Sequence, residues 1–164
     1  IGDCLHGVIA EGTAQTSDQI ETAKQACLTA GAMRSSFGLM KSMLRGIDDL
    51  GLAVGLEYGN TPICRLGLRG DASVRVAASK ATCISENEQQ RCSGLETAIG
   101  QELYDQAPSS IRESFGISRK LKNMDYETVQ ILTGVFSDHG EHAAVAEPNR
   151  AHGLSREPNR SYFA

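Results

Sequence analysis

The sequence predicts an α+β fold, with a mixed, mostly antiparallel sheet and helices packed mainly on one face. One observation is an apolar stripe that recurs at three- and four-residue steps over roughly residues 18–45, which indicates a helix of about seven turns. Another is a set of short apolar segments bounded by glycine or turn residues, including 52–59 and 96–99, which is typical of strands. Strands and helices therefore alternate along the chain, and the short turn at 60–62 indicates at least one antiparallel hairpin.

The composition is that of an ordinary globular domain. The 164 residues are 40% hydrophobic and 22% charged, with a mean hydropathy of −0.26 and a net charge of −4. This balance argues against nucleic acid or a membrane as a partner, and no apolar run approaches the roughly 18 residues of a membrane span. The five cysteines form no Cys-x-x-Cys pair, which favours reduced thiols in a cytoplasmic protein over a disulfide framework or a zinc module: Cys4, Cys27, Cys64, Cys83 and Cys92.

The first residues predict a hairpin turn that leads into a strand. Ile1 is not a start methionine, and Ile1-Gly2-Asp3 is followed by a weak period-two pattern over residues 5–9. Since a hairpin turn requires a strand before it, we expect this sequence to be the carboxy-terminal portion of a longer polypeptide.

The predicted long helix has recognisable ends, and a hairpin and a second helix are expected after it. Asp18 and Glu21 form the Asp-x-x-Glu start signature, and Gly46 follows the apolar stripe. Residues 63–69 are expected to form a strand antiparallel to 52–59. Gly70-Asp71 then breaks that strand, and the helix that follows is expected to bury an alanine-rich face: Val74, Ala77, Ala78 and Ala81.

The last third of the chain predicts a strand at 96–99, a helix over 101–115 interrupted at Pro108, and a strand at 126–132 with good strand propensity. Beyond about residue 138 the composition turns polar, and Glu-Pro-Asn-Arg occurs at 147–150 and again at 157–160. We therefore assign residues 1–135 to one domain and residues 136–164 to a polar tail.

Two segments carry side chains suited to phosphate chemistry. A carboxylate at a hairpin tip, Asp3, suits a hard cation such as Mg²⁺ or Mn²⁺, although Asp is also favoured in turns for its local hydrogen bonds. In the predicted helix after Gly70, Arg75 and Ser79 lie four residues apart and would share one face, where a guanidinium and a hydroxyl can stabilise a phosphate. A solvated surface arginine is the ordinary alternative.

Taken in order, three motifs resemble the class III nucleotidyl cyclases. That family carries I-G-D in a hairpin, then a long helix, a strand of the form G-I-x-x-G, and a segment that approximates G-D-x-V-N-x-A-A-R. Ile1-Gly2-Asp3, the Gly55-Leu56-Glu57-Tyr58-Gly59 segment and residues 70–79 match these motifs in order and approximate spacing. The resemblance covers roughly residues 1–135 and implies a ferredoxin-like sandwich whose amino-terminal strand and helices are missing from this chain.

The resemblance implies a two-metal mechanism with Mn²⁺ or Mg²⁺, in which the ribose 3′-hydroxyl attacks the α-phosphate and pyrophosphate leaves. Asp3 would be one of two metal-bridging aspartates, and the other would lie on the missing strand. The family works as a head-to-tail homodimer with its sites at the interface, so Asp3 of one subunit would face Arg75 and Ser79 of the other.

The departures from the family pattern narrow the range of expected substrates. Arg75 stands where the family has Asn, Ser79 stands where it has Arg, and the purine-reading position falls at Gly67, which offers no side-chain acceptor. Together with Arg65 and the neighbouring residues 66–70, these changes resemble the pyrimidine cyclases of bacterial anti-phage (Pycsar) systems. Such enzymes make cyclic UMP or cyclic CMP, which activates a separate effector protein, and UTP is favoured slightly over CTP.

The run Arg119 to Tyr126 precedes the last predicted strand, near the point where the family places a triphosphate-binding lysine. Lys122 is our choice for this role, with Lys120 next, and a solvated charge run is the alternative. The cluster Asp138-His139-Gly140-Glu141-His142 resembles a metal site but falls in the polar tail. Two other functions stay open, a cyclase that uses CTP or ATP and a non-catalytic dimerisation module with the same fold.

Overall fold

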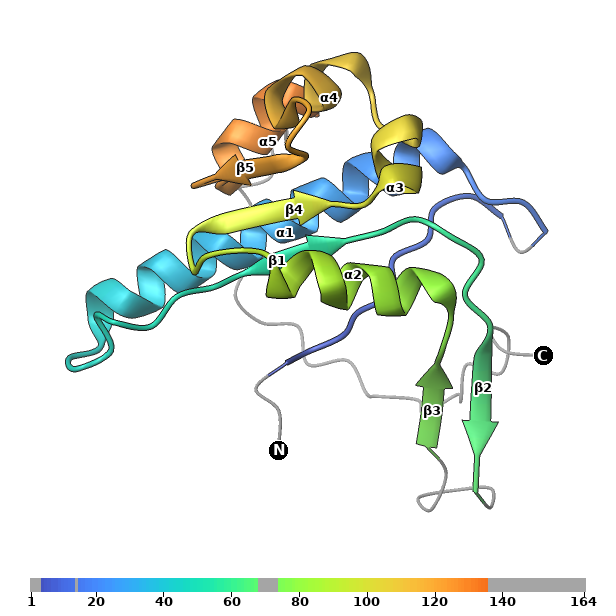
Figure 1. Ribbon diagram of the computed structural model, residues 1–164, viewed down its shortest axis with the longest axis horizontal. Helices are drawn as coiled ribbons and strands as arrows, with labels where there is room; N and C mark the ends of the chain where they lie inside the picture. Colours follow the sequence, from blue (N-terminus) through green and yellow to red (C-terminus); the bar gives the residue numbers. More distant parts are fainter. Residues whose placement is uncertain (1–3, 14, 68–73, 136–164) are drawn as a thin grey trace, which may run out of the picture.

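The computed structural model describes residues 4–13, 15–67 and 74–135, and it has the α+β class that the sequence predicts (Figure 1). The helices and strands follow one another in the order α1 (Gln19–Met43), β1 (Val54–Leu56), β2 (Ile63–Leu66), β3 (Val74–Ala77), α2 (Lys80–Gln90), β4 (Glu96–Ile99), α3 (Gln101–Gln106), α4 (Ser109–Phe115), β5 (Lys120–Lys122) and α5 (Tyr126–Thr133).

The strands form two separate units. A three-stranded sheet has the order β1-β4-β5, in which β4 pairs parallel with β1 and antiparallel with β5. Strands β2 and β3 form an antiparallel hairpin that extends away from the sheet (Figure 1). Two of the three strand pairings are therefore antiparallel, as the sequence predicts.

The helices lie mainly on one face of the sheet. Val54 faces the same side as its register partner Thr97, and it belongs to a core to which α1, α3, α4 and α5 all contribute side chains. Helix α2 covers the opposite face, where a Cβ at Gly55 would collide with the Ser85 carbonyl oxygen. Figure 1 shows the sheet between α1 and α2. A glycine in β1 is therefore what allows α2 to approach the sheet so closely.

The core is apolar and continuous from the sheet to the last helix. Its members are Ala23, Cys27, Leu28, Ala30, Val54, Ile99, Leu103, Ala107, Ile111, Phe115, Met124 and Val129. Helix α5 packs directly on α1 at Gly31, where a Cβ would collide with the Asp125 carbonyl oxygen and the Val129 side chain. Burial raises the pKa of the Cys27 thiol to about 12, so this cysteine behaves as a small apolar group.

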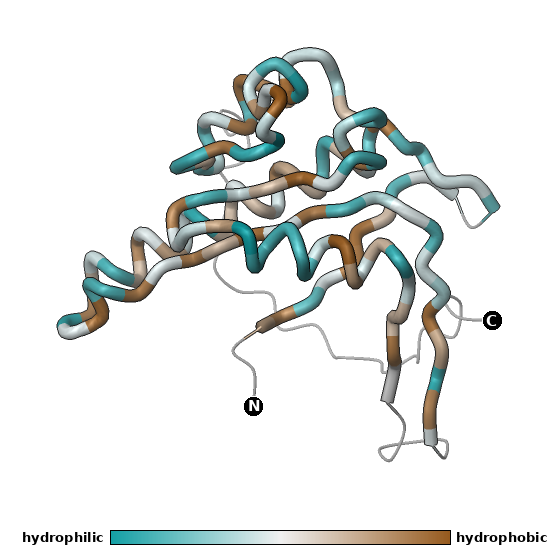
Figure 2. The backbone as a smooth tube through the Cα atoms, in the orientation of Figure 1, coloured by the Kyte–Doolittle hydropathy of each residue, from teal (hydrophilic) through white to brown (hydrophobic). Residues whose placement is uncertain are grey.

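The predicted long helix is confirmed, together with its start signal. The Asp18 carboxylate accepts a hydrogen bond from the Glu21 N–H at 2.9 Å, and Gly46 adopts a φ of +79° just beyond the helix end. The apolar stripe is buried only at Ala23, Cys27 and Ala30, whereas Ile20 before them is 55% exposed. Met40 and Leu44 are 37% and 52% exposed, at the carboxy-terminal end of α1 and just after it. This end of α1 extends past the sheet (Figure 2).

The structure also confirms the strand at 96–99, a strand within 52–59, and the break at Pro108, where α3 ends and α4 begins. The expected strand at residues 5–9 is wrong, because residues 4–11 belong to no described strand and form no ladder with one.

Two further predictions are wrong. Residues 63–66 pair with Val74–Ala77 rather than with 52–59, so residues 74–77 form a strand and the second helix begins at Lys80. Residues 126–132 lie in helix α5 and not in a strand, because Asp125 caps its first turn at Thr128 and Val129 is buried against the core. Capping and packing override the strand propensity of this segment.

No helix in the described part of the chain combines the length and apolar character needed to cross a membrane. The polar tail assigned to residues 136–164 lies outside the described residues.

Candidate active site

Asp3, residues 68–73 and the Asp138–His142 cluster lie outside the described residues, so the structure does not test their predicted positions. Within the ranges 4–13, 15–67 and 74–135, no three His, Cys, Asp or Glu side chains are grouped as a metal site requires. The described residues therefore do not themselves supply a metal site, and Asp3 stays the candidate ligand.

The β2–β3 hairpin brings Arg65 and Arg75 together. The strand register pairs the backbone of Arg75 with that of Arg65. Like charges at directly opposed positions destabilise a strand pair, so an anion that binds there would relieve this cost. Gly67 follows β2 with a φ of +93°, a conformation that favours glycine. The hairpin therefore presents positions suited to a phosphate-bearing ligand.

Charge is unevenly distributed between this region and the rest of the chain. Residues 61–80 contain four cationic side chains and one carboxylate, a net charge of +3. Because the whole chain carries −4, all other residues together carry −7. A basic segment in an acidic protein draws a polyanion to one place and repels it from the remainder of the surface.

Ser79 lies at the junction of β3 and α2, where it caps the helix. Its Oγ accepts from the Thr82 N–H at 3.1 Å, and the Thr82 Oγ1 accepts from the Ser79 N–H at 2.7 Å. Its hydroxyl also lies 2.9 Å from the Thr61 Oγ1. The prediction that Arg75 and Ser79 share one helix face is therefore wrong, because Arg75 belongs to a strand and the capping box starts the helix after Ser79.

A groove of about 480 Å³ runs between the amino-terminal segment and this junction. His6 and Val8 line one side, and Ser79 and Thr82 line the other, together with Val76, Ala77, Ala78, Cys83 and Glu86. Sequence reasoning missed His6, although it stands only three residues after Asp3. The groove thus combines polar side chains with the start of a helix, where free N–H groups favour anions.

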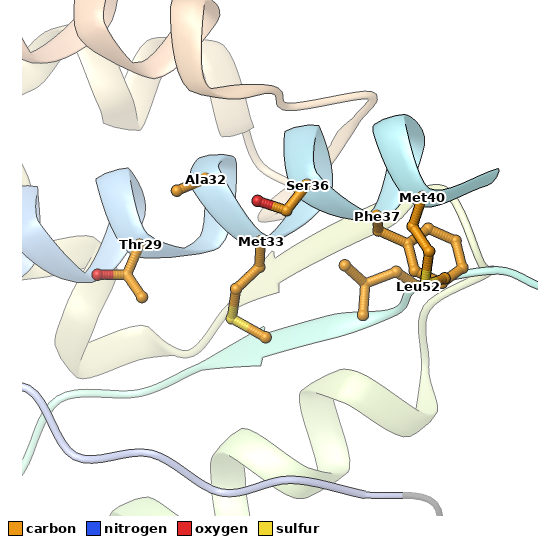
Figure 3. Close-up of a pocket in the computed structure, with 7 residues that line it drawn as sticks. All are labelled: Thr29, Ala32, Met33, Ser36, Phe37, Met40 and Leu52. Atoms are coloured by element: carbon orange, nitrogen blue, oxygen red, sulfur yellow. The ribbon is translucent and has the colours of Figure 1, made fainter. Parts of the chain in front are cut away.

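A second hollow, of about 470 Å³, lies along α1 and differs in character. Figure 3 shows its lining, which contains no charged side chain: Thr29, Ala32, Met33, Ser36, Phe37, Met40 and Leu52. A triphosphate carries several negative charges, so this apolar hollow does not suit it. Of the two hollows, the groove beside Ser79 is the better candidate for a nucleotide.

The two candidate lysines lie on β5, away from the hairpin (Figure 1). The Lys120 Nζ donates to the Arg91 carbonyl oxygen and lies 3.6 Å from the Glu96 carboxylate. The Lys120 ammonium is therefore engaged in contacts within the fold. Lys122 is exposed and sits opposite Glu96 in the strand register. Within one chain, β5 and the hairpin belong to separate strand units.

Glu57, which the sequence analysis did not single out, occupies an unusual position after β1. Its Oε1 accepts from the Tyr58 N–H at 2.8 Å and from the Leu103 N–H at 2.9 Å. Partial burial raises the pKa of this carboxyl, the two backbone N–H groups oppose the rise, and Glu102 and Glu88 add to it. The sequence signal was an acidic residue between the two glycines of Gly55-Leu56-Glu57-Tyr58-Gly59.

A solved structure with the same fold shows to which class of protein this fold belongs. The crystal structure of a class III adenylyl cyclase-like ATP-binding protein from Pseudomonas aeruginosa matches with a TM-score of 0.69 and 40% sequence identity. The match covers 75% of this chain and 27% of that chain. The fold is therefore that of a class III cyclase-like protein, and the resemblance drawn from the motifs is confirmed.

Two curated proteins named uridylate cyclase are more specific relatives. One, from a Rhizobium strain, is 49% identical over 115 residues, and the other, from Pseudomonas aeruginosa, is 40% identical over 156 residues. These matches cover 70% and 93% of this chain. The chain spans only 22% and 30% of the lengths of these relatives. No family model matches the sequence.

Proposed function

We propose that this chain is part of a metal-dependent nucleotidyl cyclase that converts UTP to 3′,5′-cyclic UMP and pyrophosphate. The observation that carries the proposal is the 40% identity to a uridylate cyclase over 93% of this chain. The uneven charge supports it, because a basic segment beside a groove that Ser79 and Thr82 help to line suits a triphosphate.

In this reaction the ribose 3′-oxygen bonds to the α-phosphorus, the bond to the β-phosphate oxygen breaks, and the 3′-hydroxyl proton leaves to solvent or a base. Negative charge grows on the phosphate oxygens during the transfer. Arg65 and Arg75 would neutralise that charge, and the first turn of α2 behind Ser79 would add backbone N–H donors. Asp3 would contribute a carboxylate to two divalent ions, Mn²⁺ or Mg²⁺.

We also propose a homodimer with sites at the interface. Within one chain, Lys122 lies on β5 on the opposite side of the molecule from the hairpin (Figure 1). A second copy could place its Lys122, or its Lys120, beside the triphosphate. In this scheme the product is a second messenger of bacterial antiviral defence that a separate effector senses, and the enzyme works in the cytoplasm.

The nucleotide base of the substrate is the part of the proposal for which the comparisons also suggest an alternative. The solved relative is described as an ATP-binding protein, whereas the two curated relatives are named for uridylate. Gly67 lacks a side chain that could accept a hydrogen bond from the adenine amino group, which favours a pyrimidine.

The test is to incubate the intact protein with Mn²⁺ and each of the four ribonucleoside triphosphates in turn, with cyclic products identified by mass spectrometry. We expect cyclic UMP as the main product. Cyclic AMP or cyclic CMP as the main product would replace the proposed specificity. No cyclic product from any of the four would favour a non-catalytic dimerisation module.

A further inference from the structure

Glu57 joins helix α3 to the segment that follows β1. Helix α3 begins at Gln101, and its own N-cap residue, Gly100, provides no side-chain cap. The Glu57 carboxylate supplies that cap from another element by accepting from the Leu103 N–H. A Cβ at Gly100 would collide with this carboxylate, so the glycine makes room for it.

The segment after Glu57 runs from the cap to the candidate site. A Cβ at Gly59 would come within 2.9 Å of the Ala81 side chain, so the chain passes directly against the first turn of α2. Two residues later, the Thr61 hydroxyl lies 2.9 Å from that of Ser79. Strand β2 and Arg65 follow at once. Residues 57–61 are therefore held at one end by α3 and at the other by α2.

We propose that Glu57 is a positioning residue that sets the placement of Ser79 and of the β2–β3 hairpin relative to the groove. Among the described elements, each hairpin strand packs mainly against the other. The placement of the hairpin therefore depends on its two connections, residues 57–62 before β2 and Ala78-Ser79 between β3 and α2. This inference rests on the proposed function only where activity is the readout. Glu57 touches neither the groove nor the candidate phosphate positions and acts through residues 58–61.

Three substitutions separate geometry from charge. Glu57→Gln keeps an oxygen where both N–H groups donate but removes the charge, so it should retain the placement. Glu57→Asp keeps the charge but withdraws the oxygens by one methylene, and Glu57→Ala removes them. Glu102→Ala, at an exposed position in the first turn of α3, is the matched control.

The first readout is UTP cyclisation by the intact protein, with KM and kcat measured separately. We expect Glu57→Asp and Glu57→Ala to lose on the order of 10- to 100-fold in kcat/KM, because small misplacements far from the reacting atoms have costs of this size. Glu57→Gln and Glu102→Ala should stay within about twofold of wild type. Equal losses in Glu57→Gln and Glu57→Ala would overturn the geometric role.

The second readout does not depend on any activity. Cys83 lines the groove and is exposed. Its alkylation rate, followed by mass spectrometry, therefore reports changes in the local structure around the junction of β3 and α2. We expect the rate to change at least about threefold in Glu57→Asp and to be unchanged in Glu57→Gln. If Glu57→Asp is folded by circular dichroism and Cys83 reacts at the wild-type rate, the proposal is wrong. A wild type without cyclase activity but with this labelling pattern would overturn only the proposed function.

Discussion

In the sheet core, Ile99 and Phe115 are at most 2% exposed, whereas every residue of β2 in the hairpin is exposed. The core joins four helices to one face of three strands, and burying each large apolar side chain there contributes roughly 1.5–3 kcal/mol. The hairpin has no comparable packing, and an isolated two-stranded hairpin is only marginally stable in water. We therefore expect the core to determine the stability of the molecule and the hairpin to take part in ligand recognition.

The charges follow the same division. The stretch that contains the hairpin is basic, and all other residues together are acidic. Core positions should therefore affect folding, and hairpin positions should affect activity. Four substitutions test this division between core and hairpin, and they are ordered from the largest to the smallest expected change in free energy.

The largest effect is expected in the core. Phe115→Ala should lower the free energy of unfolding by about 3–5 kcal/mol, because it removes a nearly fully buried ring and leaves a cavity. Urea unfolding followed by circular dichroism measures the change. Ile117→Ala, at a fully exposed position two residues further on, is the control and should stay within about 0.5 kcal/mol. A loss at Phe115 no larger than at Ile117 would contradict the assigned core.

The next effect concerns Asp3. Asp3→Ala should reduce UTP cyclisation by about 100-fold or more, equivalent to about 2.7 kcal/mol, because it removes a proposed metal-binding carboxylate. The melting temperature in metal-free buffer should not change. Asp49→Ala, in an exposed turn after α1, is the control and should keep full activity. Unaltered turnover in Asp3→Ala would favour the non-catalytic module.

A smaller effect is expected in the hairpin. Arg65→Glu should raise KM for UTP about tenfold, or roughly 1.4 kcal/mol, because it places a carboxylate where the triphosphate is proposed to bind. The unfolding free energy should stay within about 0.5 kcal/mol, since the position is exposed. Arg45→Glu changes the net charge equally at an exposed site beyond α1 and separates local from overall charge. Equal KM values in the two variants would remove Arg65 from the site.

The smallest effect tests the boundary between the two regions. The pKa of Glu57 is raised in the folded chain, chiefly by burial, so its protonated form is favoured there. Its contribution to stability is full below the unfolded pKa and is lost as the pH rises through the folded pKa. Glu57→Gln resembles the protonated form, so its free energy of unfolding relative to that of wild type should be higher at pH 8 than at pH 4. Urea unfolding at the two pH values measures this, and a gain at pH 4 that vanishes at pH 8 would reverse the sign.

The elements that the sequence predicted correctly carry their signals locally. Asp18 and Gly46 mark the ends of α1, and Pro108 separates α3 from α4. The hairpin was only half predicted. Residues 63–66 were expected to form a strand. Their local sequence does not show that they pair with 74–77 rather than with 52–59. That choice moved Arg75 from a helix to a strand and turned Ser79 into a cap.

Helix α5 also depends on contacts that the local sequence does not show. Its residues have strand propensity, yet the Asp125 cap and the close approach of α1 at Gly31 make it a helix. Glu57 was hidden for a related reason, because its partner Leu103 lies 46 residues further along the chain. Capping signals and hydrophobic periodicity act within a few residues, so the sequence alone was enough to predict the long helix, the strands at 54–56, 63–66 and 96–99, and the ordered motifs. Strand partners, helix contacts and a cap donated between elements depend on which distant segments meet, so they became visible only in the folded structure.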